Sequence, residues 1–165
     1  MIDIKKINSL DKSEFLSIFG NVFEKSEWIS EKVFTLKPFE SLESFTSNMI
    51  SIYDNCDEKI ILKILNLHPE LAVEKKLTRN SETEQIQANL IDCTTEEFNE
   101  FKFLNKEYKK KFNFPFIIAV KGKNKNEILD KFKERINNSI EIEFLEAKNQ
   151  VKKIANFRLK EIINN

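Results

Sequence analysis

Residues that interrupt helices are scarce in this sequence. Among its 165 residues the only glycines are Gly20 and Gly122, and the only prolines are Pro38, Pro69 and Pro115. Strand-rich folds use glycine and proline at their many turns, whereas both residues destabilise a helix when they lie in its interior. The scarcity therefore favours helices joined by polar turns, and the length is typical of one domain, which we expect to cover residues 1–165.

Apolar side chains recur at helical spacing along most of the chain. One such stripe contains Phe15, Ile18, Phe19, Val22 and Phe23. The segments 11–14 and 94–97 have the sequence of capping boxes, which start helices. These signals predict an all-α, single-domain bundle of about eight helices. The predicted helices cover residues 11–23, 26–34, 41–54, 57–66, 81–91, 95–111, 125–137 and 140–162.

The segment 114–120 breaks the helical pattern, with the sequence Phe-Pro-Phe-Ile-Ile-Ala-Val. A short apolar run rich in β-branched residues is typical of a buried strand. A single strand in a helical protein has no partner strand, so its backbone groups must bind side chains, water or a ligand. We expect either an extended apolar binding wall, or a buried connector, or a helix that starts after Pro115.

Composition argues against several classes of protein. The 27 basic and 27 acidic residues give a formal net charge of zero, whereas nucleic-acid-binding domains are usually basic. The sequence has neither an apolar run of membrane-spanning length nor an apolar signal segment at its start. Cys56 and Cys93 form no CxxC pair, which is typical of a reducing compartment. We expect a cytoplasmic protein that binds neither nucleic acid nor membranes.

The sequence offers few residues for cofactor chemistry. One histidine and two separated cysteines cannot form a standard zinc site, and two glycines cannot form a phosphate-binding loop. No GxSxG motif signals a serine nucleophile. The remaining possibilities are acid–base chemistry without a metal or cofactor, or no chemistry at all.

His68 is the only histidine, and histidine is the side chain that most readily changes charge near neutral pH. Pro69 disfavours helical backbone at His68, so the helix predicted over 57–66 must end there. Ser81, Glu84 and Gln85 follow on one face of a predicted helix start, with Ser81 as N-cap and Glu84 as its capping-box partner. Such a helix start also favours anionic ligands. His68 is either a surface or structural residue, or a proton-handling group.

Two of the three arginines lie on or beside predicted apolar stripes, Arg158 within one and Arg135 next to another. Arg158 falls within the seam of the last helix, which consists of Ile140, Phe144, Ala147, Val151, Ile154, Ala155 and Ile162. A guanidinium on an apolar face needs an anionic partner, because an unpaired buried charge is costly. The partner of Arg158 is either a structural carboxylate or a substrate carboxylate held bidentately. For Arg135 we expect a structural ion pair.

Several short motifs add a more specific signal through their order and spacing. They are FEKSEWI at 23–29, KPF at 37–39, HPEL at 68–71, SxxEQ at 81–85, LNxxY at 104–108, KFNFPFI at 111–117 and QVxxIAxxRL at 150–159. By these motifs the chain resembles, over nearly its whole length, the 2-oxo-4-hydroxy-4-carboxy-5-ureidoimidazoline (OHCU) decarboxylases. That family forms (S)-allantoin in urate degradation.

The resemblance implies an all-helical fold, decarboxylation without a cofactor or metal, and commonly a homodimer. It implies that the catalytic residues are His68, Glu84 and Arg158, with Glu84 raising the basicity of the imidazole. It also implies that the substrate-binding residues are Pro69, Ser81, Glu82, Thr83, Gln85, Phe116, Ile117, Ile118, Ala119 and Val120.

Three positions where the family usually has glycine carry other residues, namely Ala72, Asn89 and Asn113. Asparagine tolerates left-handed backbone better than most residues, so the change at Asn113 is mild. We expect these changes to affect nearby loops more than the fold. Two alternatives to this function are a non-catalytic helical protein that binds ureides or a partner, and a decarboxylase of a related ureido acid.

Overall fold

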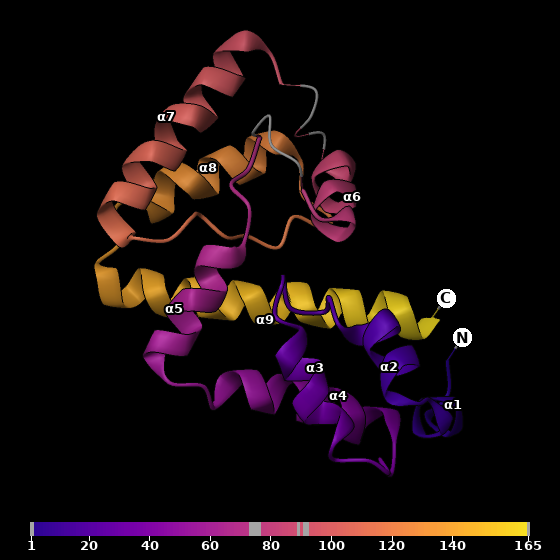
Figure 1. The fold of residues 1–165 in the computed structure, drawn as a ribbon. Coiled ribbons are helices and arrows are strands. Elements are labelled where there is room, and N and C mark those ends of the chain that lie inside the picture. The colour runs from indigo at the N-terminus through magenta and orange to yellow at the C-terminus, as the bar shows by residue number, and fades with distance from the viewer. Residues whose placement is uncertain (1, 73–76, 89, 91–92, 165) are drawn as a thin grey trace. The chain divides into compact units, whose positions relative to one another are not determined.

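The computed structural model describes residues 2–72, 77–88, 90 and 93–164, which contain nine helices and no strand (Figure 1). The helices are α1 (Ile4–Ser9), α2 (Lys12–Phe19), α3 (Glu27–Phe34), α4 (Leu42–Asp54), α5 (Glu58–Leu67), α6 (Arg79–Gln87), α7 (Thr95–Phe112), α8 (Lys125–Arg135) and α9 (Ile140–Asn164). The predicted all-α class is therefore confirmed. The chain divides into two compact units: unit 1 is Met1–Ile64 with Lys152–Asn165, and unit 2 is Leu65–Val151.

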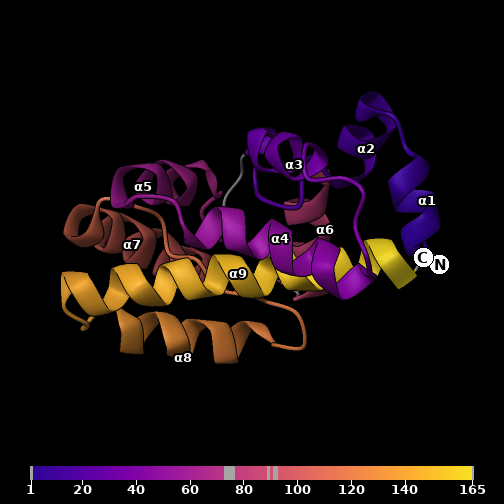
Figure 2. The ribbon, with the colours of Figure 1, turned by 90° about the horizontal axis from the view of Figure 1, so that it is seen from below.

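In unit 1, α3 packs against both α2 and α4, as Figure 2 shows. Its core is aromatic: the ring of Phe19 lies 5.0 Å from that of Phe15 and 4.9 Å from that of Phe45, between ring centroids. Asp11 forms the predicted capping box with Glu14 at the start of α2. The apolar stripe that predicted this helix therefore marks a true core face.

One helix boundary and one additional helix in unit 1 differ from the prediction. Helix α2 ends at Phe19 rather than at residue 23, although Val22 and Phe23 are buried. These two residues lie in a non-helical bend and are as buried as the core side chains of the helix, so the apolar pattern continues past the helix end. Helix α1 was not predicted, because it has only six residues and Ile7 is its one buried side chain.

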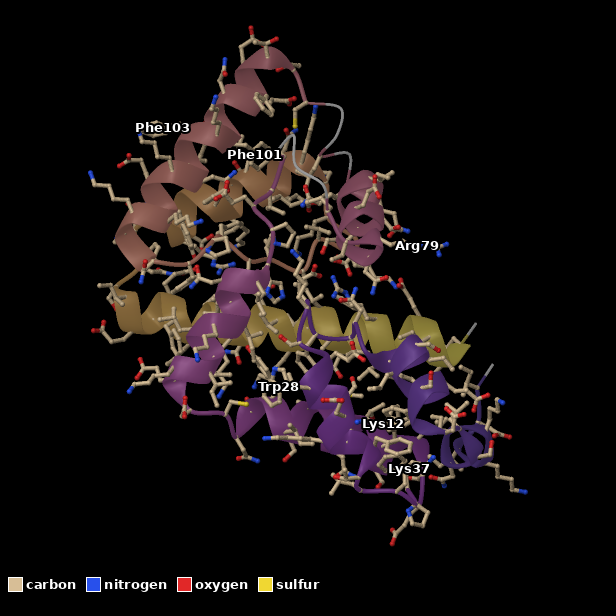
Figure 3. The ribbon with its side chains drawn as sticks, viewed as in Figure 1. Lys12, Trp28, Lys37, Arg79, Phe101 and Phe103 are labelled. Carbon is tan, nitrogen blue, oxygen red and sulfur yellow. The ribbon has the colours of Figure 1, made fainter. Side chains whose placement is uncertain are left out.

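Unit 2 contains the predicted extended segment, which follows the left-handed C-cap of α7 at Asn113. Residues 114–120 are all buried and form neither a helix nor a ladder. The extended segment is confirmed, and a helix starting after Pro115 is excluded. Helices α7 and α8 contact each other, and the exposed Phe103 lies on α7 two residues from the fully buried Phe101 (Figure 3).

Two other predictions in unit 2 need correction. Helix α6 covers Arg79–Gln87 rather than 81–91, and Asn89 lies outside the described residues. Ile140 is 57% exposed, so it does not belong to the buried seam predicted for α9. Its place near the start of the helix puts it beyond the packed part of that face, whereas Ala147 is fully buried.

None of the helices described here combines the length and the apolar character needed to cross a membrane. The remaining predicted helices agree with the structure to within about two residues at each end, the usual uncertainty of helix boundaries.

Candidate active site

His68 directly follows the last residue of α5, where Pro69 prevents the helix from continuing. Its backbone N–H donates to the carbonyl of Leu65 at 3.2 Å, which closes the last turn. The residue is 8% exposed, so His68 is not a surface histidine. His68 is therefore either a structural residue or a proton-handling group, and the turn that follows it shows how its position is fixed.

The turn after Pro69 is held by side chains from two helices. Gln85 of α6 donates its Nε2 to the carbonyl of Glu70 at 3.2 Å and accepts the N–H of Ala72 on its Oε1 at 3.1 Å. Asn105 of α7 donates its Nδ2 to the carbonyl of Leu71 at 2.9 Å. Ala72 has a φ of +50°, the left-handed conformation that glycine adopts more easily. The backbone thus keeps a glycine-like turn without glycine.

The N-cap of α6 is Thr78 rather than Ser81. The Thr78 hydroxyl accepts the backbone N–H of Ser81 at 3.4 Å, so the helix begins before the predicted start. Thr78 and Ser81 are three residues apart and both are good N-cap residues, so the sequence alone does not show which of them caps the helix. The predicted capping box between Ser81 and Glu84 is therefore wrong, and both residues lie inside the helix.

Only some of the predicted site residues on α6 are buried. Ser81 and Gln85, four residues apart, are buried, and Glu84 beside them is partly buried. Glu82 and Thr83 are exposed, and the Thr83 hydroxyl donates to the carbonyl of Arg79 at 2.9 Å. Arg79 itself is exposed and extends outward from α6 (Figure 3). The buried face consists of a hydroxyl and an amide with a carboxylate at its edge.

The segment 116–120 is held by side chains of α8 and α9. Gln150 accepts the N–H of Ala119 on its Oε1 at 2.9 Å, and Arg135 donates its Nη1 to the carbonyl of Ile117 at 2.8 Å. The prediction that this backbone must bind side chains, water or a ligand is confirmed for these two groups. The segment is a buried connector whose polar groups are fixed in place.

Arg135 forms the predicted structural ion pair. Its Nε and Nη2 donate to Glu143 Oε1 at 3.0 and 2.5 Å, and its guanidinium lies over the ring of Phe116. Glu143 is fully buried and also accepts the hydroxyl of Tyr108 and the Nδ2 of Asn138. Burial, reinforced by the neighbouring Glu143 carboxylate, raises the pKa of the Tyr108 hydroxyl, so Tyr108 serves this network as a neutral donor.

Arg158 lies in unit 1 and has a structural carboxylate as partner. Its Nη1 and Nη2 both lie 3.2 Å from Glu24 Oε2, and its Nη1 donates to the carbonyl of Asn21 at 3.1 Å. Both charged side chains are almost completely buried. The structural alternative for the partner is therefore present, while a role of Arg158 toward substrate stays a prediction.

Sequence reasoning missed the residues that support this site. Asn105 shares a face of α7 with Phe101, Leu104 and Tyr108, all of which are buried. A polar residue on such a stripe is a signal that could have identified it.

The described residues contain no group of three histidine, cysteine, aspartate or glutamate side chains placed to hold a metal ion.

Comparison with known proteins gives one consistent family. The family described as OHCU decarboxylase matches residues 8–160. The "Uric acid degradation bifunctional protein" of Bacillus sp. (strain TB-90) is 40% identical over 98% of this chain and 32% of its own length. The 2-oxo-4-hydroxy-4-carboxy-5-ureidoimidazoline decarboxylase of Haloferax volcanii is 32% identical over 97% of this chain and 95% of its own.

A solved structure supports the same fold. The crystal structure of an (S)-allantoin synthase has a TM-score of 0.78 and 27% identity over 98% of this chain and 54% of that one. This chain spans about a third of the length of the Bacillus protein and about half of the crystallised synthase.

Proposed function

This chain belongs to the OHCU decarboxylase family, and we propose that it decarboxylates 2-oxo-4-hydroxy-4-carboxy-5-ureidoimidazoline to (S)-allantoin in urate degradation. The observation that carries the proposal is the buried His68, the one histidine of the chain, at the start of a turn that α6 and α7 hold.

The proposed chemistry needs no cofactor. The substrate carries its carboxylate on a ring carbon next to a C=N group, which accepts the electron pair left when carbon dioxide departs. The protein then has to orient the substrate, place charge, and deliver one proton to one face of the neighbouring ring carbon, which carries the ureido group, while the hydroxyl-bearing carbon becomes a carbonyl. His68 and Glu84 form the proton-handling pair, in which the carboxylate favours the protonated imidazole.

The remaining roles follow from the resemblance and from the local structure. Arg158 binds an anionic or carbonyl group of the substrate. Ser81 and Gln85, both buried on α6, and the backbone of 116–120 hold the ureido and ring amides. Pro69 borders the site. Glu82 and Thr83, which are exposed on the same helix turn, are further proposed substrate-binding residues.

Carbon dioxide release distinguishes this function from its main alternative. Urate oxidase and hydroxyisourate hydrolase generate the unstable substrate in place from urate, and the rate of carbon dioxide release is measured with and without the protein. The proposal predicts acceleration in proportion to protein concentration. A protein that binds allantoin in calorimetry but leaves the release rate unchanged is instead a ureide-binding relative.

We also propose that residues 1–165 act as one domain, because the family match at 8–160 includes parts of both units. A homodimer is the proposed assembly. In unit 2 it is supported by three large apolar side chains near the start of α9, those of Ile140, Ile142 and Leu145, which are each more than half exposed. Sedimentation should give twice the chain mass, and Ile142→Lys should lower it.

We propose a cytoplasmic location, where thiols stay reduced; in support, Cys56 and Cys93 are thiols that are not joined in a disulfide.

A further inference from the structure

Two neutral amides hold three consecutive residues of the turn after Pro69. Gln85 binds the carbonyl of Glu70 and the N–H of Ala72, and Asn105 binds the carbonyl of Leu71. Gln85 and Asn105 are both about 95% buried, so these bonds are shielded from competing water. We call this set of three hydrogen bonds the amide clamp.

The conformation of Ala72 explains why a clamp is needed here. Its φ of +50° lies in the left-handed region, where the Cβ of alanine crowds the following carbonyl oxygen. An unsupported alanine would leave this region, and the carbonyls of Glu70 and Leu71 would turn with it. The clamp therefore fixes a turn that the sequence of the turn itself does not favour.

The amide of Asn105 is used on one side only. Its Nδ2 donates to Leu71, whereas its Oδ1 is buried and accepts no hydrogen bond from the residues that the structure describes. A buried acceptor without a partner is unfavourable, and a leucine of similar size would avoid that cost. The donor bond to the Leu71 carbonyl is therefore the interaction that favours asparagine over leucine at this position.

We propose that Asn105 is a positioning residue that, through the amide clamp, sets the orientation of the His68 imidazole. The connection is short and stiff: Pro69 has a fixed φ, and only Glu70 separates it from the clamped carbonyl of Leu71. Asn105 needs no contact with substrate in this role. Its effect on turnover rests on the proposed decarboxylase function, whereas its effect on His68 does not.

The single histidine makes the positioning claim measurable without an activity assay. The carbon-bound imidazole protons of His68 give the only histidine signals in an NMR spectrum of this chain. Asn105→Leu removes the donor together with the unpaired acceptor, so it should fold. Asn8→Leu is the matched control, since Asn8 Nδ2 donates to the carbonyl of Phe39 at 2.8 Å within unit 1.

We expect shifted or broadened His68 signals in Asn105→Leu and unchanged signals in Asn8→Leu. Unchanged signals in Asn105→Leu, or equal changes in both variants, would overturn the proposal. Asn105→Asp, which keeps the shape but loses the donor, should repeat the effect and serves if the leucine variant does not fold.

Kinetics then link the clamp to the reaction. Loss of the clamp should lower kcat of Asn105→Leu on the order of tenfold to a hundredfold, with KM changed much less, because misplacement of a catalytic group slows the chemical step. Glycine adopts the left-handed turn without support from the clamp. Adding Ala72→Gly to Asn105→Leu should therefore raise kcat several-fold, whereas Ala72→Gly alone should raise kcat of the unmodified protein by less than about twofold.

Equal gains in both backgrounds would contradict a shared action of Asn105 and Ala72 on the turn. If the unmodified protein releases no carbon dioxide, the decarboxylase proposal fails, and the His68 signals still decide the role of Asn105.

Discussion

Two backbone segments of unit 2 contribute to the proposed site, and they are fixed by different chemistry. The turn 70–72 is held by the uncharged amides of Gln85 and Asn105. The segment 116–120 is held by Arg135, whose charge is balanced by the buried Glu143, and by the amide of Gln150. The comparison indicates that a buried ion pair supports the connector, whereas the backbone of the turn next to His68 is bound by neutral amides and the Glu70 side chain forms a more exposed ion pair with Lys109 at 3.5 Å.

This difference has a physical basis. A charged group bound to the backbone of the turn would favour one protonation state of the neighbouring imidazole, whereas a neutral amide adds no such bias to the effect of the proposed partner Glu84. A buried ion pair instead makes its surroundings intolerant of change, since loss of one partner leaves an uncompensated charge. We therefore expect that damage to the 116–120 support costs stability, and that damage to the turn support costs turnover.

The largest effect should come from Arg135→Met. The variant leaves Glu143 buried without its cationic partner, which should lower the free energy of unfolding by about 3–5 kcal/mol. Chemical denaturation measures this loss. The double variant Arg135→Met with Glu143→Leu is the control, and it should recover much of the stability. A single variant within about 1 kcal/mol of the unmodified protein would remove the contrast between the two segments.

A smaller effect is expected for Gln150→Leu. The N–H of Ala119 then stays buried without an acceptor, at a cost of about 1–3 kcal/mol in unfolding free energy. Because the 116–120 backbone is proposed to bind substrate, KM should rise as well. Denaturation and steady-state kinetics test both, and a change in kcat alone would assign Gln150 to the chemistry rather than to the segment.

Ala72→Gly should stabilise the protein, in contrast to most substitutions of buried residues. It relieves the left-handed strain of alanine but gives the unfolded chain more freedom, so the net gain is about 0.5–1 kcal/mol. Thermal unfolding tests the sign. Destabilisation would mean that contacts of the Ala72 methyl group outweigh the backbone strain.

The smallest effect concerns pH. A hydrogen bond from Lys125, with a second from the Thr94 backbone N–H, holds the pKa of Glu97 below its ordinary value of 4.5. A lowered folded-state pKa adds stability above pH 4.5, which is lost as the pH falls through the folded value. Glu97→Gln should be less stable than the unmodified protein at pH 7, and the difference should shrink as the pH falls below 4.5. A difference that persists at low pH would have another origin.

Sequence predicted the positions of elements better than the conformations within them. Pro69 ends α5 just before His68 for a local steric reason, and Asp11 caps α2 through its neighbours, so both features could be predicted. The left-handed Asn113 was also foreseeable from its residue type. The left-handed Ala72 was not, because its conformation depends on Gln85, which follows thirteen residues later in the chain.

The buried charges show the same limit. The apolar stripe predicted that Arg135 needs a carboxylate, but no spacing rule identifies Glu143, which also serves Tyr108 and Asn138. Glu24, the partner of Arg158, is 134 positions away in sequence. Partners brought together only by folding lie beyond reasoning from periodicity.

The most direct test of the account is the handedness of the product. The substrate is generated in place from urate, and the circular dichroism of the allantoin formed is followed with the unmodified protein and with His68→Ala at equal thermal stability. We predict rapid formation of one enantiomer by the unmodified protein and slow formation of racemic product with His68→Ala. Equally rapid, single-handed turnover by both proteins would contradict it, because His68 would then not handle the proton.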